Sequence, residues 1–279
     1  MTLKFSSIFF AIFFFAASVF ANESRLTFAT WNTRWQSQED VEKGDNWKKR
    51  VEPIVNVIRF FDFDIVAMQE NSAAKQRDLE PLLTGYEFIQ NDTMEYNPIV
   101  IKKGMFKVLE KGRFYLSKTP YIKSKSWDSK NYRYCTWAKL QKDSSVFYVF
   151  NTHFDYHGKI AKEESAKLLN QVIPSMVKES AYILAGDFNS TEGSKAYNTL
   201  VSSSYIKDSK HLAEVVHLVK NSYNYFDPMR VSKWDLDHIF VAPGTKVFRY
   251  GVLNETYFDG ETYRYPSDHS PIMVIMESP

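Results

Sequence analysis

The amino-acid sequence predicts an α/β sandwich built on mixed sheets. Two observations carry this prediction: apolar runs of strand length alternate with a few segments of helical spacing, and short links join many neighbouring strands. The chain of 279 residues is 44% hydrophobic and holds 22 Phe, 17 Tyr and 6 Trp, which is enough for a sizeable core. It has no phosphate loop and no GxGxxG motif, so a doubly wound nucleotide-binding fold is excluded.

The first residues are set apart from the rest of the chain. Residues 1–21 carry one charged side chain, Lys4, and are otherwise dominated by an apolar run that begins at Phe5. This pattern is typical of a secretory signal peptide cut after Ala21; the alternative, an uncleaved membrane anchor, suits such a short run less well. We therefore expect a secreted or periplasmic protein, with no stable membrane insertion after cleavage and residues 22–279 as its one folded domain.

The predicted elements follow from the spacing of the apolar residues. Helices are expected over 51–61, over 159–173, where Pro174 should end or kink the helix, and over 194–200, capped by Ser190 or Thr191. Strands are expected over 24–31, 64–68, 86–90, 98–101, 105–116, 132–140, 146–151, 181–185, 236–241, 247–253 and 272–276.

Polar side chains recur where these strands end. The clearest case is the turn between Pro266 and Pro271, which places a carboxylate beside an imidazole just before a buried strand. In a second case, Gly186 allows a tight exit from the strand, and two oxygen-bearing side chains follow it two residues apart. The whole set consists of Asn32, Glu70, His153, Asp187, Asn189, Asp237, Asp268 and His269.

This set of side chains is rich in oxygen ligands and contains no sulfur. Hard oxygen ligands suit Mg²⁺ or Mn²⁺, with Ca²⁺ as a further possibility, rather than a structural zinc ion. Imidazoles beside carboxylates can transfer protons near neutral pH, and metal-assisted attack of water on a phosphoester uses these functions together. Structural roles stay open as alternatives: Asn32 as a turn cap, Asp187 and Asn189 as an Asx turn, and Asp237 as a buried partner of an Arg.

Six short motifs, taken in order, resemble those of the endonuclease/exonuclease/phosphatase superfamily, which includes deoxyribonuclease I, AP endonucleases and bacterial sphingomyelinases. The resemblance covers the chain from about residue 25 to its end. It implies a four-layer sandwich in which helices flank two central mixed, mostly antiparallel β-sheets, and it makes residues 22–279 the catalytic domain. The motifs are Trp31-Asn32, Gln69-Glu70, Asn151-Thr152-His153-Phe154-Asp155, Gly186-Asp187-Phe188-Asn189, Leu236-Asp237-His238-Ile239-Phe240 and Ser267-Asp268-His269.

The resemblance also implies a role for each residue of the set. Glu70 is expected to be the principal metal ligand, with Asn32 and Asp268 beside it. Asp187 and Asn189 are expected to orient the attacking water and hold the phosphate.

The remaining roles concern proton transfer and the phosphate. His269 is expected to act as general base or as a partner that stabilises the phosphate, and Asp237 to orient a histidine. His153 is expected to contact the phosphate and, as a second role, to act as general acid. Glu95 is expected to support His153. Arg133 is expected to bind the phosphate of the substrate.

The substrate is the least determined part of the prediction. Residues 102–139 carry eleven Lys or Arg against Glu110 and Asp128, so DNA or RNA is the first expectation, although a solvated basic rim is an alternative. The formal net charge of +2 is nearly neutral. Hydrolysis of a small phosphoester (a phosphosugar, an inositol phosphate or a phospholipid headgroup) is the second expectation, and a non-catalytic binding module the third. The single cysteine, Cys135, excludes an intrachain disulfide, and we expect a monomer.

Overall fold

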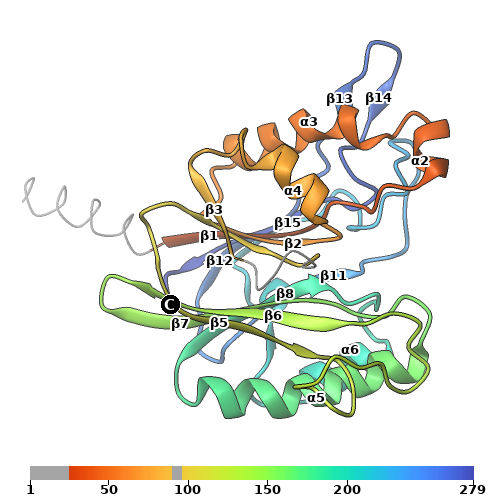
Figure 1. Ribbon diagram of the computed structural model, residues 1–279. Coiled ribbons are helices and arrows are strands. Elements are labelled where there is room, and N and C mark those ends of the chain that lie inside the picture. The colour runs from red at the N-terminus through yellow and green to blue at the C-terminus, as the bar shows by residue number, and fades with distance from the viewer. Residues whose placement is uncertain (1–24, 90–95) are drawn as a thin grey trace, which may run out of the picture.

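The computed structural model describes residues 25–89 and 96–279. The predicted signal peptide and Glu95 lie outside the described residues. Two large sheets pack face to face, and helices cover the outer face of each, so the order of layers is helices, sheet, sheet, helices (Figure 1). This arrangement confirms the four-layer α/β sandwich with two central mixed, mostly antiparallel sheets.

The first sheet has seven strands in the order β10-β12-β15-β1-β2-β4-β3. Its centre is the parallel pair β1 and β2, with β15 antiparallel to β1. The strands are β1 (Arg25–Asn32), β2 (Ile65–Gln69), β3 (Tyr86–Ile89), β4 (Ile99–Lys102), β10 (Val215–His217), β12 (Val247–Val252) and β15 (Ile272–Glu277).

The second sheet has six strands in the order β5-β6-β7-β8-β11-β9. Only its central pair β7 and β8 is parallel, while β11 runs antiparallel to β8. The strands are β5 (Lys107–Tyr115), β6 (Tyr134–Lys142), β7 (Ser145–His153), β8 (Ala181–Asp187), β9 (Lys207–Asp208) and β11 (Asp237–Val241).

The helices divide between the two outer faces. Helices α3 (Trp47–Phe60) and α4 (Ala73–Leu79) pack on the first sheet, while α5 (Lys159–Val177) and α6 (Lys195–Val201) pack on the second (Figure 1). Two shorter helices, α2 (Gln38–Glu42) and α7 (Ser209–Leu212), lie in connections. The side chains between the two sheets form a third apolar cluster, so each sheet is buried on both faces.

Two local predictions about helices need correction. Of the two outcomes expected at Pro174, an end or a kink, the end was wrong: helix α5 continues to Val177, because Ile173 and Val177 are buried against the second sheet and hold the last turn in place. Helix α6 is capped by Ser194, whose hydroxyl accepts from the amide of Tyr197, rather than by Ser190 or Thr191.

A short hairpin, β13 (Tyr257–Phe258) with β14 (Tyr263–Arg264), projects from the first sheet's side of the molecule (Figure 1). Phe258 and Tyr263 are exposed on it, and Asp259, in the loop that joins the two strands, pairs with Arg264 and Lys49. Within the described ranges, no helix has the length and apolarity needed to cross a membrane.

Candidate active site

The register of the strands brings the predicted side chains to one end of the two sheets. On β8, Asp187 lies opposite His153 of the parallel strand β7 and opposite Asp237 of the antiparallel strand β11. In the first sheet, Asn32 at the end of β1 lies opposite Gln69, the residue before Glu70. Strand pairing alone therefore places five polar residues at two facing sheet ends.

Hydrogen bonds across the sandwich fix these two ends against each other. The side-chain amide of Gln69 donates to Asn151 Oδ1 (2.7 Å), and the amide of Asn151 donates to the carbonyl of Met68 (2.7 Å). On the other side, the indole of Trp31 donates to the carbonyl of His269 (2.8 Å). All of these groups are buried, so the bonds are shielded from water and hold the turn of His269 in register with the strand of Asn32.

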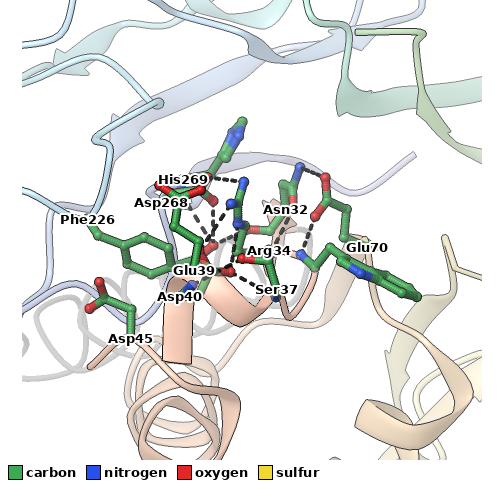
Figure 2. Close-up of polar contacts among 12 residues, drawn as sticks. Asn32, Arg34, Ser37, Glu39, Asp40, Asp45, Glu70, Phe226, Asp268 and His269 are labelled. Atoms are coloured by element: carbon green, nitrogen blue, oxygen red, sulfur yellow. Dashed lines mark hydrogen bonds and ion pairs between the residues drawn. The ribbon is translucent and has the colours of Figure 1, made fainter. Parts of the chain in front are cut away.

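Asn32 joins the two carboxylates that face each other across the sheets. Its side-chain nitrogen donates to Glu70 Oε1 (3.2 Å) and to Asp187 Oδ2 (2.9 Å), and its Oδ1 accepts from the amide of Arg34 (2.9 Å). Figure 2 shows Asn32 turned toward Glu70. The contact places an amide donor between two acidic groups and so lessens their repulsion.

His269, Asp237 and Asp187 form a buried titratable cluster. His269 Nδ1 lies 2.7 Å from Asp237 Oδ2, its Nε2 lies 3.8 Å from Asp187 Oδ2, and one ligand atom of each residue falls within 4.8 Å of the others. Burial alone would lower the pKa of His269, but the carboxylates of Asp237 and Asp187 outweigh it and raise that pKa to about 10. His269 is therefore an imidazolium at neutral pH.

The same cluster has the opposite effect on Asp187. Burial, and then the charge of Asp237, raise the pKa of Asp187 to about 7, although His269 and the amide of Asn32 act in the other direction. The pKa values of the two neighbouring groups are thus driven apart: His269 keeps its proton at neutral pH, and Asp187 exchanges its proton near neutrality. This is the pattern expected of an acid–base site.

His153 stands on the far side of Asp187 and stays neutral. Its Nε2 lies 3.4 Å from Asp187 Oδ2 and 3.1 Å from the side-chain nitrogen of Asn189. Burial, Arg133 and His269 lower the pKa of His153 well below its usual value. A group that holds a proton so weakly suits the expected role of phosphate contact better than that of general acid.

A cavity of about 380 Å³ joins most of the predicted residues. Glu70, Arg133, His153, Asp187, Asn189 and His269 line it together with Tyr156, Lys162, Tyr223, Tyr225, Trp234 and Leu236. Arg133 Nε and Asp237 Oδ1 are buried and have no hydrogen-bonding partner among the described residues. The unpaired donor of Arg133 lies beside the cavity, and the unpaired acceptor of Asp237 belongs to the His269–Asp237 pair. Both indicate that a ligand completes this site.

Asp268 is held by an arginine that the sequence analysis did not single out. Arg34 donates to Asp268 Oδ2 (3.1 Å) and grips both oxygens of Asp40 (3.1 Å each), and Figure 2 shows Arg34 between these two carboxylates. Burial raises the pKa of Asp268, although the charges of His269 and Arg34 act against the rise. In this arrangement Arg34 supplies the positive charge next to Asp268.

Two buried basic side chains lie behind the expected metal ligands, and neither was singled out from the sequence. Lys75 is 3% exposed, and its ammonium donates to the carbonyls of Thr33 (3.0 Å), Arg34 (2.9 Å) and Glu70 (3.0 Å). Arg50 is 0% exposed and donates to the carbonyls of Thr33 and Pro266 (2.9 Å each). Together they tie the turns after β1 and β2 to the turn that carries Asp268.

The backbone is strained at two of the site residues. Glu70 and Asn189 have positive φ angles of 55° and 46°, which residues with a side chain seldom adopt. Such conformations persist where surrounding contacts impose them, and they cluster at functional sites. Nearby, Gly186 (φ 150°) allows β7 and β8 to approach, since a Cβ there would lie 1.9 Å from the carbonyl oxygen of Thr152.

The donor set fits a hard divalent cation. Glu70 and Asp187 offer carboxylates, the amide of Asn32 bridges them, and Asp237 adds a buried oxygen without a partner. Oxygen-rich sites of this kind suit Mg²⁺ or Mn²⁺.

Comparisons with known proteins agree with this geometry. Residues 29–269 match the Endonuclease/Exonuclease/phosphatase family. An uncharacterised protein of Acanthamoeba polyphaga mimivirus is 24% identical over 252 residues, which cover 83% of this chain and 92% of the relative.

Solved structures are similar over nearly the whole fold. A Bacteroides thetaiotaomicron protein of the endonuclease/exonuclease/phosphatase family is 34% identical with a TM-score of 0.87, over 91% of this chain and 98% of its own. A mannosyl-6-phosphatase of the same organism is also 34% identical, with a TM-score of 0.86 over 89% and 98% of the chains. TDP2 of D. rerio, solved with a single-strand DNA product, shares the fold with a TM-score of 0.73 at 17% identity, over 91% and 100%.

Six of the nine predicted residues line one cavity, and the family match runs from β1 to His269. The chain belongs to the endonuclease/exonuclease/phosphatase family, whose members hydrolyse phosphoesters.

Proposed function

We propose that this protein is a divalent-metal-dependent phosphatase of small phosphoesters, with phosphorylated sugars as the substrate class. The observation that carries the proposal is the shape of the site: the phosphate-binding groups lie in a bounded cavity of about 380 Å³ whose walls include Tyr156, Tyr223, Tyr225 and Trp234. Pockets of this size bury small ligands. The similarity to a mannosyl-6-phosphatase supports the same substrate class.

The chemistry assigned to the residues follows from their charges. The Glu70 carboxylate, which lines the cavity, would hold a divalent cation, and the cation would supply Lewis acidity toward a phosphoryl oxygen. Asp187, with a pKa of about 7, accepts the proton of an attacking water, which is the efficient range for a general base.

Two cations and two neutral groups receive the phosphate. The His269 imidazolium, fixed by Asp237 at 2.7 Å, and the Arg133 guanidinium stabilise the negative charge that builds on phosphorus. Asn189 and His153, which are 3.1 Å apart, position the phosphoryl oxygens. The general-base role expected for His269 passes to Asp187 in this proposal, because a group with a pKa of about 10 holds its proton at neutral pH.

A nuclease, the first expectation from the sequence, becomes the second candidate. The connection that leads to Arg133 carries exposed lysines, among them Lys118, Lys123 and Lys130. Elsewhere the basic stretch is partly neutralised: Lys102 pairs with Asp62 and Asp64, and Lys139 with Glu110. Within the described residues, Arg133 is the one member of the stretch that lines the catalytic cavity. This distribution of basic residues favours a substrate with a single phosphate over a nucleic acid bound along its backbone.

A panel assay in Mg²⁺ and in Mn²⁺ tests the proposal. Mannose 6-phosphate and glucose 6-phosphate should release inorganic phosphate, and chelation should stop the release. Plasmid DNA, RNA and bis-p-nitrophenyl phosphate should be cleaved far more slowly. Efficient DNA or RNA cleavage with a steep loss of affinity as salt rises would instead establish the nuclease.

We also propose that the protein is exported and acts as a monomer in the periplasm or outside the cell. The support is the composition of residues 1–21 and the single, buried cysteine. N-terminal sequencing of protein from the periplasmic fraction should read from residue 22, and a start at residue 1 in the cytoplasm would contradict export.

A further inference from the structure

The catalytic cavity continues past its aromatic wall. A second cavity of about 540 Å³ adjoins it and shares Lys162, Asn189, Trp234 and Leu236 with it. Asn189 faces both cavities: its side chain contacts His153, and its carbonyl accepts from Lys162 Nζ (2.9 Å). A group that extends from the phosphate past Asn189 therefore enters the second cavity.

The lining of the second cavity is amphipathic. Trp234 is 50% exposed and Ile160 is 57% exposed, so two large apolar side chains face solvent beside the catalytic site. Three hydroxyl residues, Ser190, Thr191 and Ser194, line the same cavity. Exposed apolar surface that adjoins polar groups in a hollow is typical of ligand-binding sites.

Charged side chains at the rim of the second cavity can also form hydrogen bonds with a ligand. Lys159, Lys162 and Lys195 line the cavity together with Glu163, which pairs with Lys167 (3.1 Å), and Lys162 already donates to the carbonyl of Asn189. The cavity therefore offers hydrogen-bond donors and an acceptor together with an aromatic face, rather than a purely cationic hollow. This mixture matches a neutral ligand that has many hydroxyl groups.

We propose that the second cavity is a subsite for a glycosyl group, so that the substrate is a phosphorylated oligosaccharide or glycoside rather than a free monosaccharide phosphate. A sugar ring has an apolar C–H face that packs on an indole and an edge of hydroxyls that pair with polar side chains. Trp234 supplies the first surface, and Ser190, Thr191 and the lysines supply the second. The inference rests on the proposed function, since it requires the phosphorylated ring to occupy the catalytic cavity.

A binding experiment tests the subsite without relying on catalysis. The full chain is labelled with 5-fluorotryptophan, and the Trp234 resonance is assigned with Trp234→Phe. Mannobiose, which carries no phosphate, should shift this resonance saturably and bind more tightly than mannose or adenosine. Ile160→Ser and Lys195→Ala should each weaken the binding of mannobiose. The double variant should raise the Kd by about tenfold or more, which corresponds to a loss of about 1.4 kcal/mol of binding free energy. Lys246→Ala, an exposed lysine at another cavity, is the matched control and should bind as the wild type does.

Kinetics on two substrates then separate the subsite from the proposed function. The wild type should hydrolyse 6-phosphorylated mannobiose with a higher kcat/KM than mannose 6-phosphate, and Ile160→Ser should reduce that ratio. No saturable shift with mannobiose, or tighter binding of adenosine, overturns the glycosyl subsite even if both phosphates are hydrolysed. A saturable shift without phosphate release from either compound overturns the proposed function and leaves the subsite standing.

Discussion

The ammonium of Lys75 donates a hydrogen bond of 3.0 Å to the carbonyl oxygen of Glu70, the residue expected to be the principal metal ligand. The same ammonium also binds Thr33 Oγ1 at 2.7 Å, so one buried cation holds the turns that follow β1 and β2. The left-handed backbone of Glu70 is thus fixed by a contact of its own carbonyl. The position of the carboxylate depends on a side chain that touches neither substrate nor metal.

Lys75→Met should weaken both the fold and metal binding. It leaves buried carbonyls without a donor, at a cost of roughly 1–3 kcal/mol in the free energy of unfolding, and it frees the turn of Glu70 to move. Urea unfolding and Mn²⁺ titration measure the two effects. Lys48→Met, at an exposed position of α3, should change the unfolding energy by less than about 0.5 kcal/mol. Unchanged Mn²⁺ affinity in Lys75→Met would show that the lysine does not position Glu70.

Asp187→Asn should remove most of the activity and leave the fold intact. An amide cannot accept the proton of the attacking water, so kcat should fall by roughly 10²–10⁴-fold. Phosphate release under saturating substrate measures the change, and the thermal midpoint checks the fold. Asp143→Asn, at an exposed turn between β6 and β7, is the matched control. A kcat within a few-fold of the wild type would assign the base to another group.

The ion pair of His269 with Asp237 should make stability depend on pH. The pKa of His269 is raised from 6.5 to about 10, so the folded state retains a proton that the unfolded state loses above pH 6.5. The stabilisation by this pair is therefore complete below pH 6.5 and is lost as the pH rises toward 10. In EDTA, the gap in unfolding energy between wild type and Asp237→Asn should be widest near pH 6 and shrink toward pH 10. A gap that stays constant over this range would refute the ion pair.

Gly186→Ala should be far more damaging than the same change at another glycine of positive φ. A Cβ at Gly186 lies 1.9 Å from the carbonyl oxygen of Thr152, so the parallel strands β7 and β8 must separate. At Gly244 (φ 83°) no atom lies within 4 Å of the added carbon. Gly244→Ala therefore measures the cost of the left-handed backbone conformation alone, roughly 1 kcal/mol. Chemical denaturation of both variants measures the difference. Equal losses in the free energy of unfolding would mean that the close approach of β7 and β8 at Gly186 does not contribute to stability.

The strand-end residues were accessible from sequence because each lies next to the end or the start of an apolar run that the core requires. Asp187 ends the buried strand β8 and Asp237 begins the buried strand β11, and strand register then places them side by side. The supporting cations were not accessible. Lys75 and Arg50 lie on helices α4 and α3 where a charged residue normally faces water, and only the approach of three turns gives them buried acceptors.

The walls of the cavity were inaccessible for a different reason. Tyr223, Tyr225 and Trp234 belong to a long irregular connection before β11, where neither helical nor strand spacing indicates which side chains point inward. Their place depends on contacts between distant segments, such as the amide of Asn224 with the carbonyl of Asp268 (2.7 Å). In the proposed function these walls select the substrate. The sequence motifs therefore predicted the chemistry but not the substrate.

Phosphate release from mannose 6-phosphate by wild type and Glu70→Gln, each with EDTA and with Mg²⁺ restored, tests the central claim most directly. We predict that chelation abolishes wild-type turnover, that Mg²⁺ restores it, and that Glu70→Gln stays at least about 10²-fold slower at every Mg²⁺ concentration with an unchanged unfolding midpoint. Wild-type turnover that survives chelation, together with near-normal turnover in Glu70→Gln, would contradict the metal-assisted site.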